Sequence, residues 1–418
     1  MFNFSLIKNL KKKFFPFYKN KDLKFVFKKL QEGYSRRPRT AMFVGGCVRN
    51  HLLNEDIDDI DIATSLTTDQ VREKFKDTKY KVIDSGIKHG TVTLVLKKLK
   101  LELTTLRKDI KTDGRHAEIE YTDDWQEDSN RRDFTINAIY LDADGKIFDP
   151  QLGIHDLKNY IVKFIGDPQK RIEEDYLRII RFIRFSLLYK NEIEKKIIEV
   201  IKLNLNGIKK ISKERILIEL FKILNTKNFE KLNNKQPLKE IFLLIFPEFK
   251  YFERLNKLNE IKISSIFDKT ILLSILLIDE KNNHEYFLHK YNVSNNLKDD
   301  LNLITKNYIN SLKNKNFFKK DLKKNIFHFG KKHLELLSIV CFSINKKIKL
   351  DDYLNILNNI KKISLPQFPF DGNYLKDKGI KEGKSVGETL KLIQDEWLNN
   401  GFKISNQRIS EIIDNQKN

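Results

Sequence analysis

The chain has few cysteines, no long apolar run and, near its start, few acidic residues. Its 418 residues include two cysteines, Cys47 and Cys341, which lie far apart and lack metal-ligand spacing. This excludes a disulfide framework and fits a reducing cytoplasm. No apolar run reaches the ~18 residues of a membrane span, and residues 1–20 lack the apolar core and cleavage site of a signal peptide. We therefore expect a cytoplasmic protein with no membrane partner.

Basic residues dominate where acidic residues are scarce. Lys and Arg number 79 against 57 Asp and Glu, giving a net charge of +22. Residues 1–40 hold 12 basic residues against two acidic ones, Asp22 and Glu32. Such an excess favours polyanion partners, nucleic acid first, although a general compositional shift toward Lys explains the charge equally well. We expect residues 1–40 to form a basic N-terminal extension that can contact RNA backbone.

The sequence pattern changes near residue 150, from mixed to helical. Strand patterns occur at 41–44, 57–63, 91–96, 100–105 and 134–141, and helical patterns at 47–53 and 69–75. Residues 108–118 are polar and predict a mobile loop, and residues 142–145 predict a hairpin turn. After Pro150 the strand patterns stop, and single helices are expected over 173–189 and 213–224. We expect an α+β protein whose mixed head is followed by all-helical regions.

A glycine pair follows the first predicted strand. Gly45 and Gly46 end the apolar run 41–44, and Arg49 comes one helical turn later. Glycines let a backbone approach phosphate closely. An arginine in the first turn of a helix opposes the helix dipole, unless it faces an anion. An ordinary strand-to-helix turn can contain the same pair, so the neighbouring motifs are needed to favour a triphosphate site.

Two aspartates with i, i+2 spacing follow the glycine pair. Asp59 and Asp61 flank an isoleucine in an extended segment, so their side chains share one face. Magnesium is often held by one or two carboxylates together with substrate phosphates, although most Asp-x-Asp pairs are solvated turns. Glu102 alternates with apolar residues on another strand and is either a third carboxylate or an exposed edge residue. We predict that Asp59 and Asp61 hold Mg²⁺.

A double arginine precedes the last predicted strand of the head. Arg132 suits phosphate recognition, and Asp133 and Asn137 are placed to bond a ribose hydroxyl. A surface salt-bridge cluster would use the same residue types.

A polar stripe follows the predicted helix 173–189, with Asp175, Arg178, Arg181 and Arg184 at i+3 steps. The stripe is either the wall of a cleft or an i, i+3 salt bridge with two solvated arginines. Aspartate accepts hydrogen bonds and arginine donates them. Cytosine and adenine both present an amino donor beside a ring-nitrogen acceptor. Uracil and guanine reverse this order and would leave buried groups unpaired, at about 1–3 kcal/mol each. An Asp/Arg pair can therefore select C and A together.

In this order and spacing, the segments resemble the bacterial-type (class II) tRNA nucleotidyltransferases, the CCA-adding enzymes, and the related bacterial poly(A) polymerases. The resemblance covers residues 41–224, with one visible departure, Asn50, where the family carries Asp. The matching segments are Gly-Gly-Cys-Val-Arg (45–49), Asp-Ile-Asp-Ile-Ala-Thr (59–64), Gly-Ile-Lys-His-Gly-Thr-Val-Thr (86–93), Glu-Leu-Thr-Thr-Leu-Arg (102–107), Arg-Arg-Asp-Phe-Thr-Ile-Asn-Ala (131–138), Ile-Gly-Asp-Pro (165–168), Glu-Asp-Tyr-Leu-Arg (174–178) and Lys-Glu-Arg-Ile (213–216).

The resemblance implies a polymerase-β-like nucleotidyltransferase head (41–158), a nucleotide-selecting helical neck (159–227) and a tRNA-binding helical body and tail (228–418). It implies that Asp59 and Asp61 hold the metal ions and that Glu102 is the third catalytic carboxylate. Gly46, Arg49 and Arg132 resemble nucleotide-binding positions, Asp175 and Arg178 the base-selecting pair, and Arg181 and Arg184 later positions of the same helix. Gly45, Asp133 and Asn137 complete the predicted nucleotide-binding set.

The activity that the resemblance implies is template-independent addition of CCA to the 3′ end of tRNA from CTP and ATP, by two-metal nucleotidyl transfer. The segment 89–91 and the loop 109–118 look more like the CCA-adding branch than like poly(A) polymerases. The alternatives are poly(A) polymerase, an enzyme that adds only CC or only A, and a non-catalytic RNA-binding protein that keeps the fold. Both aspartates of Asp-x-Asp are present, which argues against the last.

Overall fold

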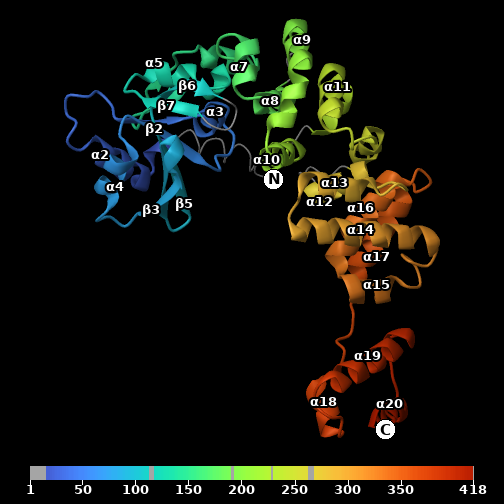
Figure 1. The fold of residues 1–418 in the computed structure, drawn as a ribbon. Coiled ribbons are helices and arrows are strands. Elements are labelled where there is room, and N and C mark those ends of the chain that lie inside the picture. The colour runs from blue at the N-terminus through green and yellow to red at the C-terminus, as the bar shows by residue number, and fades with distance from the viewer. Residues whose placement is uncertain (1–15, 113–116, 190–192, 227–228, 262–267, 418) are drawn as a thin grey trace, which may run out of the picture. The chain divides into compact units, whose positions relative to one another are not determined.

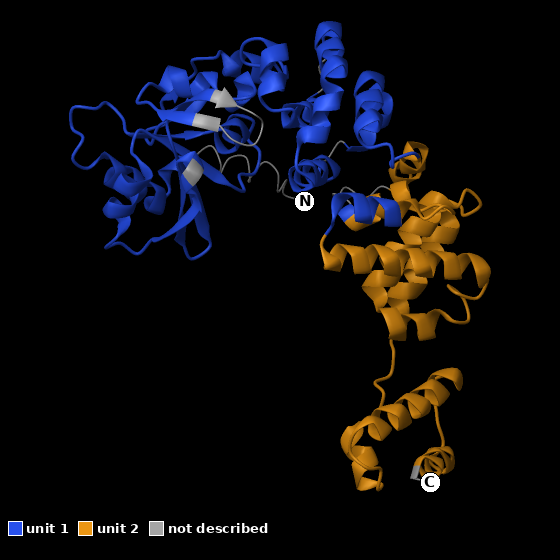
Figure 2. Ribbon diagram, in the orientation of Figure 1, with its two compact units in different colours: residues 1–250, 265–269, 285–293 blue, residues 251–264, 270–284, 294–418 orange. Residues whose placement is uncertain are grey.

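The computed structural model describes residues 16–112, 117–189, 193–226, 229–261 and 268–417, and these form two compact units (Figures 1 and 2). Unit 1 falls within residues 1–250, 265–269 and 285–293, and unit 2 within residues 251–264, 270–284 and 294–418. None of the helices in the described ranges is both long enough and apolar enough to cross a membrane.

A mixed sheet forms the head of unit 1, with its seven described strands in the order β3-β4-β5-β2-β1-β8-β9 (Figure 1). Every neighbouring pair is antiparallel except β2 and β5, which run parallel. The apolar run of β1 is buried throughout, as expected for a strand covered on both faces. The strands are β1 (Ala41–Val44), β2 (Ile60–Thr64), β3 (Lys81–Gly86), β4 (Thr91–Leu96), β5 (Leu99–Thr105), β8 (Tyr140–Leu141) and β9 (Ile147–Phe148).

Part of the basic N-terminal segment belongs to the head. The described part of residues 1–40 contains η1 (Phe17–Lys19) and α2 (Lys21–Gln31), and α2 buries Leu23, Val26, Phe27 and Leu30. The Phe27 ring lies 4.4 Å from that of Phe43 on β1, measured between centroids. Residues 1–15, where much of the predicted RNA-contacting extension falls, lie outside the described residues. The other head helices are α3 (Gly46–Leu52), α4 (Thr68–Phe75), α5 (Trp125–Asn130) and α6 (Gly153–Lys158).

The prediction of a mobile loop at residues 108–118 is wrong for its described part. β6 (Arg107–Thr112) and β7 (Ala117–Tyr121) pair antiparallel as a separate two-stranded sheet, and residues 113–116 lie outside the described residues. Besides the backbone pairing, an ion pair between Lys108 and Glu120 joins the two strands, and the side chain of Ile110 is largely exposed. Apolar periodicity gives little signal for strands made mostly of polar residues.

The predicted strand 134–141 is shorter than expected, because residues 135–137 form a 3₁₀ turn, η3 (Thr135–Asn137). The Asp133 carboxylate accepts hydrogen bonds from Phe134 N and from Asn137 Nδ2, both at 2.9 Å. Such local side-chain bonds compete with strand pairing. The strand predicted over 57–63 likewise begins later, at Ile60.

The single helix predicted over 173–189 is two helices, α7 (Pro168–Glu174) and α8 (Leu177–Leu188), which are separated at Asp175. Asp175 has an extended backbone (φ −154°, ψ 103°), and its Oδ1 accepts a hydrogen bond from Leu177 N at 3.2 Å. A local bond of this kind, from an aspartate side chain to the backbone two residues on, competes with helical hydrogen bonds and favours such a break. The helix predicted over 213–224 is confirmed as α10 (Lys213–Leu224). The remaining elements of unit 1 include α9 (Lys195–Asn204), η4 (Leu205–Lys210), η5 (Phe229–Asn234) and α11 (Gln236–Ile245); α13 (Asn283–Tyr291) is divided between the units.

Unit 2 is helical in all its described elements, as predicted (Figure 2). Its last three helices have a core of their own, formed by Leu375, Ile380, Val386, Ile393, Ile409, Ile412 and Ile413. The elements are η6 (Phe252–Asn259), α12 (Lys269–Leu277), α14 (Asn295–Lys313), α15 (Leu322–Phe329), α16 (Lys331–Ile344), α17 (Leu350–Lys362), α18 (Gly372–Asp377), α19 (Lys384–Asn399) and α20 (Asn406–Lys417).

Candidate active site

A cleft of about 580 Å³ in unit 1 gathers almost all the predicted site residues. Its lining includes twelve of them: Gly45, Gly46, Arg49, Asp59, Asp61, Arg132, Asp133, Asn137, Asp175, Arg178, Arg181 and Arg184. Glu102 is not part of the lining, but it pairs in register with Asp61 across the parallel strands β2 and β5. The lining also contains residues that the sequence did not indicate, among them Phe185, Arg215 and Lys222.

At one end of the cleft, the backbone of the turn at Gly45 lies close to the carboxylate of Asp61. Gly45 has φ +74°, a conformation that glycine adopts without strain, and α3 begins directly after it. A Cβ atom at Gly45 would lie 3.5 Å from Asp61 Oδ2. The beginning of α3 therefore lies beside the predicted metal ligands, as the sequence pattern suggested.

The carboxylates at this end carry negative charge that the neighbouring arginines offset only in part. Burial raises the pKa of Asp61 to about 6, and the neighbouring Glu102 and Asp59 add to this rise, while Arg132 and Arg49 oppose it. A carboxylate with a raised pKa gains from a nearby cation. Among the described residues no group of three or more His, Cys, Asp or Glu side chains is arranged to hold a metal ion. Asp59 and Asp61 would therefore supply only part of the ligands of a divalent cation. Substrate phosphates or water would supply the rest, as is common for magnesium.

Cys47 also lies in the lining, and its thiol is buried. Burial raises the pKa of this thiol to about 12, and the thiol donates to the carbonyl oxygen of Val44 at 3.3 Å. Both features disfavour the thiolate form near neutral pH.

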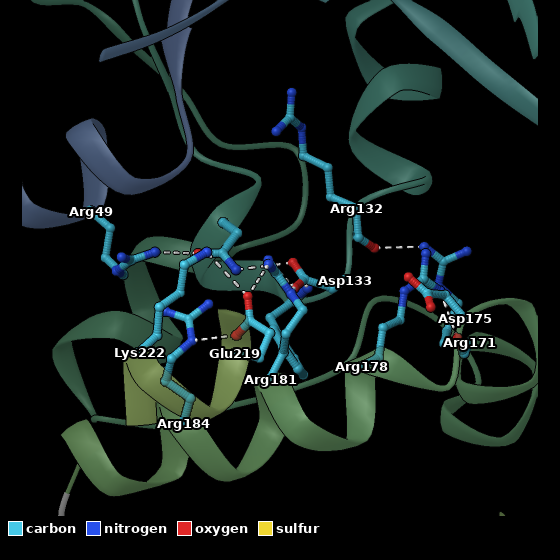
Figure 3. Close-up of polar contacts among 12 residues, drawn as sticks. Arg49, Arg132, Asp133, Arg171, Asp175, Arg178, Arg181, Arg184, Glu219 and Lys222 are labelled. Atoms are coloured by element: carbon cyan, nitrogen blue, oxygen red, sulfur yellow. Dashed lines mark hydrogen bonds and ion pairs between the residues drawn. The ribbon is translucent and has the colours of Figure 1, made fainter. Parts of the chain in front are cut away.

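The arginines of the helix α8 are held in a hydrogen-bonded network rather than solvated (Figure 3). Arg181 Nη2 lies 2.6 Å from Asp133 Oδ2, and Arg184 Nε donates to Glu219 Oε2 at 2.8 Å. Burial raises the pKa of Asp133, but Arg181 and the hydrogen bonds from Asn137 and Phe134 outweigh it and hold the pKa at about 2. The interpretation of two solvated arginines is therefore wrong.

The network reaches the glycine turn through Asn137. Its Oδ1 accepts from Arg49 Nη1, and its Nδ2 donates to Asp133 at 2.9 Å. The Phe185 ring lies next to three guanidinium groups: the Cζ atoms of Arg184, Arg49 and Arg181 lie 4.2, 4.9 and 5.8 Å from its centroid. This cation–π contact holds cationic groups at the cleft wall without neutralising them.

Asp175 and Arg178 both line the cleft, but each has its own hydrogen-bond partner. Asp175 Oδ2 accepts from Arg215 Nη2 at 2.7 Å, and Arg178 Nη1 donates to Glu174 Oε2 at 2.7 Å. The sequence analysis placed the two residues on one continuous helix, whereas they flank the start of α8. Asp175 thus lies in the break between α7 and α8, and Arg178 lies in the first turn of α8, with each side chain held by its own hydrogen-bond partner.

Two buried carboxylates of the site were not predicted, Asp128 and Glu219. Asp128 is fully buried on α5 and binds both Arg131 and Arg132, while Glu219 on α10 binds Arg184 and Lys222. The i+3 and i+4 spacing from Asp128 to the double arginine was visible in the sequence. No local spacing connects Glu219 with α8.

Comparison with known proteins assigns the chain to a family. Residues 41–163 match the family model described as Poly A polymerase head domain, and residues 192–252 match the probable RNA and SrmB-binding site of polymerase A. The mitochondrial CCA tRNA nucleotidyltransferase 1 of Mus musculus is 31% identical over 391 residues, which cover 92% of this chain and 89% of the mouse protein. The chain belongs to the CCA tRNA nucleotidyltransferase family. It is an enzyme of that type, and the family resemblance seen in the sequence is confirmed.

A bacterial relative and a solved structure agree with this assignment. The CCA-adding enzyme of Lactobacillus helveticus is 31% identical over 394 residues, 90% of this chain and 92% of the relative. The crystal structure of the Bacillus stearothermophilus CCA-adding enzyme in complex with CTP superposes with a TM-score of 0.67 over 94% of this chain and 96% of that chain, at 24% identity. The predicted fold class, an α+β protein with a polymerase-β-like head, is confirmed. As a CCA tRNA nucleotidyltransferase, the chain carries its glycine turn and carboxylates inside the matched head domain, whereas α8 lies between the two matched regions.

Proposed function

We propose that this protein adds C, C and A in turn to the 3′ end of tRNA, using CTP and ATP and no nucleic-acid template. The observation that carries the proposal is the cleft in which a carboxylate-lined sheet edge faces a helix bearing hydrogen-bonding Asp and Arg side chains. Relatives named for this activity span about nine-tenths of both chains. Structural neighbours are titled as complexes of CCA-adding enzymes with CTP, ATP and tRNA_CCA.

In the proposed reaction the terminal 3′-hydroxyl of tRNA attacks the α-phosphate of the bound nucleotide, a new P–O bond forms, and pyrophosphate leaves. Enzymes of this kind generally use a divalent metal, and we propose Mg²⁺, held by Asp59 and Asp61 with Glu102 beside them. When bound, the metal would neutralise phosphate charge and favour the deprotonated hydroxyl. Arg49 and Arg132 would bind the triphosphate.

Base selection follows from the fixed hydrogen-bonding groups at the start of α8. The Asp175 carboxylate accepts from the amino group of C or A, and Arg178 donates to the adjacent ring nitrogen. Arg215 binds Asp175 and Glu174 binds Arg178, each through a hydrogen bond of 2.7 Å, and these two bonds hold the side chains in place. U or G would place donor against donor and acceptor against acceptor, so both bases are disfavoured.

The helical unit 2 is proposed to bind the tRNA through its phosphates and shape. A hollow of about 560 Å³ is lined by Lys319, Lys323 and Lys362, together with the half-buried Phe318. Within the described ranges none of these three lysine side chains forms an ion pair. Unpaired cations that surround one hollow favour an anionic partner. We also propose a reducing, cytoplasmic location, since Cys47 and Cys341 are both free and buried.

A second candidate is poly(A) polymerase activity, which the description of the matched head-domain model favours. Purified protein should be offered a tRNA that lacks its 3′ CCA, with each nucleotide alone and with CTP plus ATP. Addition of two C residues and one A, followed by arrest, supports CCA addition. A long A tail would instead support the second candidate, and no incorporation at all would refute both.

A further inference from the structure

Asp128 is a completely enclosed charged residue of the head. It lies on α5 with 0% of its surface exposed, and each of its carboxylate oxygens binds one arginine. Oδ1 accepts from Arg131 Nε at 2.8 Å, and Arg131 Nη2 lies 2.7 Å away. Oδ2 accepts from Arg132 Nη2 at 3.0 Å and from the Tyr140 hydroxyl at 2.7 Å. Four side-chain donors therefore converge on one buried carboxylate.

Asp128 stays ionised in this environment. Burial raises its pKa, but Arg132, Arg131 and the hydrogen bonds outweigh this and hold the pKa well below its usual range. The cluster of Asp128, Arg131, Arg132 and Tyr140 has one negative and two positive charges. It therefore presents net positive charge to the cleft, which both arginines line.

The contacts fix the orientation of Arg132 in particular. Its Nε donates to the Tyr140 hydroxyl oxygen at 3.1 Å, and its Cζ lies 5.2 Å from the centroid of the Tyr140 ring. Arginine has five N–H donors, and these contacts occupy only one side of the guanidinium. Arg132 also lowers the pKa of Asp61, so its charge acts at the carboxylate end of the cleft. In Figure 3 its guanidinium is directed away from the Asp133–Arg181 contacts.

We propose that Asp128 is a positioning residue for nucleotide phosphate: it holds the Arg131 and Arg132 guanidiniums in the orientation that receives the triphosphate. This inference rests on the proposed function of the cleft. A carboxylate suits the position because both oxygens accept hydrogen bonds. An asparagine of the same shape would keep one acceptor and turn an amide donor toward guanidinium donors.

The test is the Asp128→Asn variant of the full chain, with CTP and ATP affinity measured by titration calorimetry and incorporation by steady-state kinetics. We expect KM and Kd for both nucleotides to rise roughly 10–100-fold, by analogy with the range found when the outer hydrogen-bond partner of a metal-ligating side chain is removed. Affinity for tRNA should stay near that of the unmodified protein. Tyr140→Phe, which removes the hydrogen bond that the hydroxyl donates to Asp128 and the one that it accepts from Arg132 Nε, should raise KM by about 2–10-fold.

A double-mutant cycle separates positioning from general stability. With Arg132→Ala already present, Asp128→Asn should raise KM by no more than about threefold, because coupled residues are not additive. The matched control is Asp156→Asn. Asp156 is also a buried head aspartate, which accepts from Thr135 Oγ1 at 2.6 Å, and it does not line the cleft. This control should lower Tm but leave nucleotide KM unchanged.

Unchanged nucleotide affinity in Asp128→Asn, or an equal KM rise with and without Arg132, would overturn the inference. If Asp128→Asn does not fold, Tyr140→Phe decides, since it keeps the ionised carboxylate and its two arginines. Failure of the proposed function has a different signature. In that case the unmodified protein would bind CTP without extending tRNA, and the Asp128 comparison would still be read from CTP affinity.

Discussion

Replacing Asp175 with asparagine tests whether protein side chains choose the base. The amide keeps one oxygen, which can accept from Leu177 N as Asp175 Oδ1 does at 3.2 Å, while its NH₂ group takes the place of Oδ2, the acceptor of the Arg215 hydrogen bond. It differs from the carboxylate in offering an NH₂ donor. That donor can meet the O4 acceptor of uracil, which the carboxylate repels. Asp175→Asn therefore changes hydrogen-bond polarity with little change in shape.

The expected magnitude follows from the number of mismatched groups. UTP meets two mismatches in the unmodified site, one at Asp175 and one at Arg178, and the variant removes the first. Each buried unpaired group costs about 1–3 kcal/mol, so the ratio of kcat/KM for CTP over UTP should fall by roughly 5–150-fold. The ratio is read from single-nucleotide incorporation into a tRNA that lacks its 3′ CCA.

Arg215→Ala is the matched control for this change. It removes the 2.7 Å hydrogen bond to Asp175 Oδ2 but leaves both carboxylate oxygens as acceptors. It should lower overall efficiency while keeping the preference for CTP. Full CTP selectivity in Asp175→Asn, or equal loss of selectivity in the two variants, would refute base selection by the Asp175 carboxylate.

Three further outcomes follow from the same geometry. Asp61→Ala should abolish incorporation and leave tRNA affinity in filter binding nearly unchanged; normal turnover would contradict the metal assignment. Replacing Lys319, Lys323 and Lys362 together with Gln should reduce the slope of log affinity for tRNA against log salt by about one unit for each phosphate that a lysine no longer neutralises, and an unchanged slope would exclude the hollow as a tRNA-binding surface. Glu219→Ala should destabilise unit 1 by about 3–5 kcal/mol, because it removes the buried carboxylate that pairs with the partly buried Arg184; urea unfolding that shows less than about 1 kcal/mol would contradict this value.

The local features of the site were predictable because they depend on residues close in sequence. The glycine turn, Asp61 on its strand and Arg49 one turn into α3 all fall within a span of about 20 residues, where turn and strand rules apply. The helix α10 was predicted to the residue because its apolar face is regular and the polar residues Ser212 and Asn225 flank it. Glu102 beside Asp61 was predicted only as a candidate, since the parallel register of β2 and β5 is a tertiary property.

The missed features depend on partners distant in sequence. Arg184 and Glu219 are 35 residues apart, and Asp175 and Arg215 are 40 residues apart. No window of helical or strand periodicity contains both members of either pair. The β6–β7 ribbon was missed for a different reason, because its polar alternation is equally compatible with a solvated loop. The structure thus brings most of the predicted site residues to one cleft, with Glu102 outside its lining, but their hydrogen-bond partners could not be assigned from the sequence.

The break at Asp175 involves both residues close in sequence and a residue distant in sequence. Periodicity predicted one helix because Glu174 and Leu177 each fit a helical face. In the structure the Tyr176 ring lies where a Cβ atom on Gly207 would be, at a distance of 2.0 Å. A side chain at residue 207 in η4 would therefore displace Tyr176, the residue next to the proposed base-selecting carboxylate. The packing of Tyr176, the residue next to Asp175, thus depends on the absence of a side chain 31 positions further along the chain, and this dependence is tertiary rather than local.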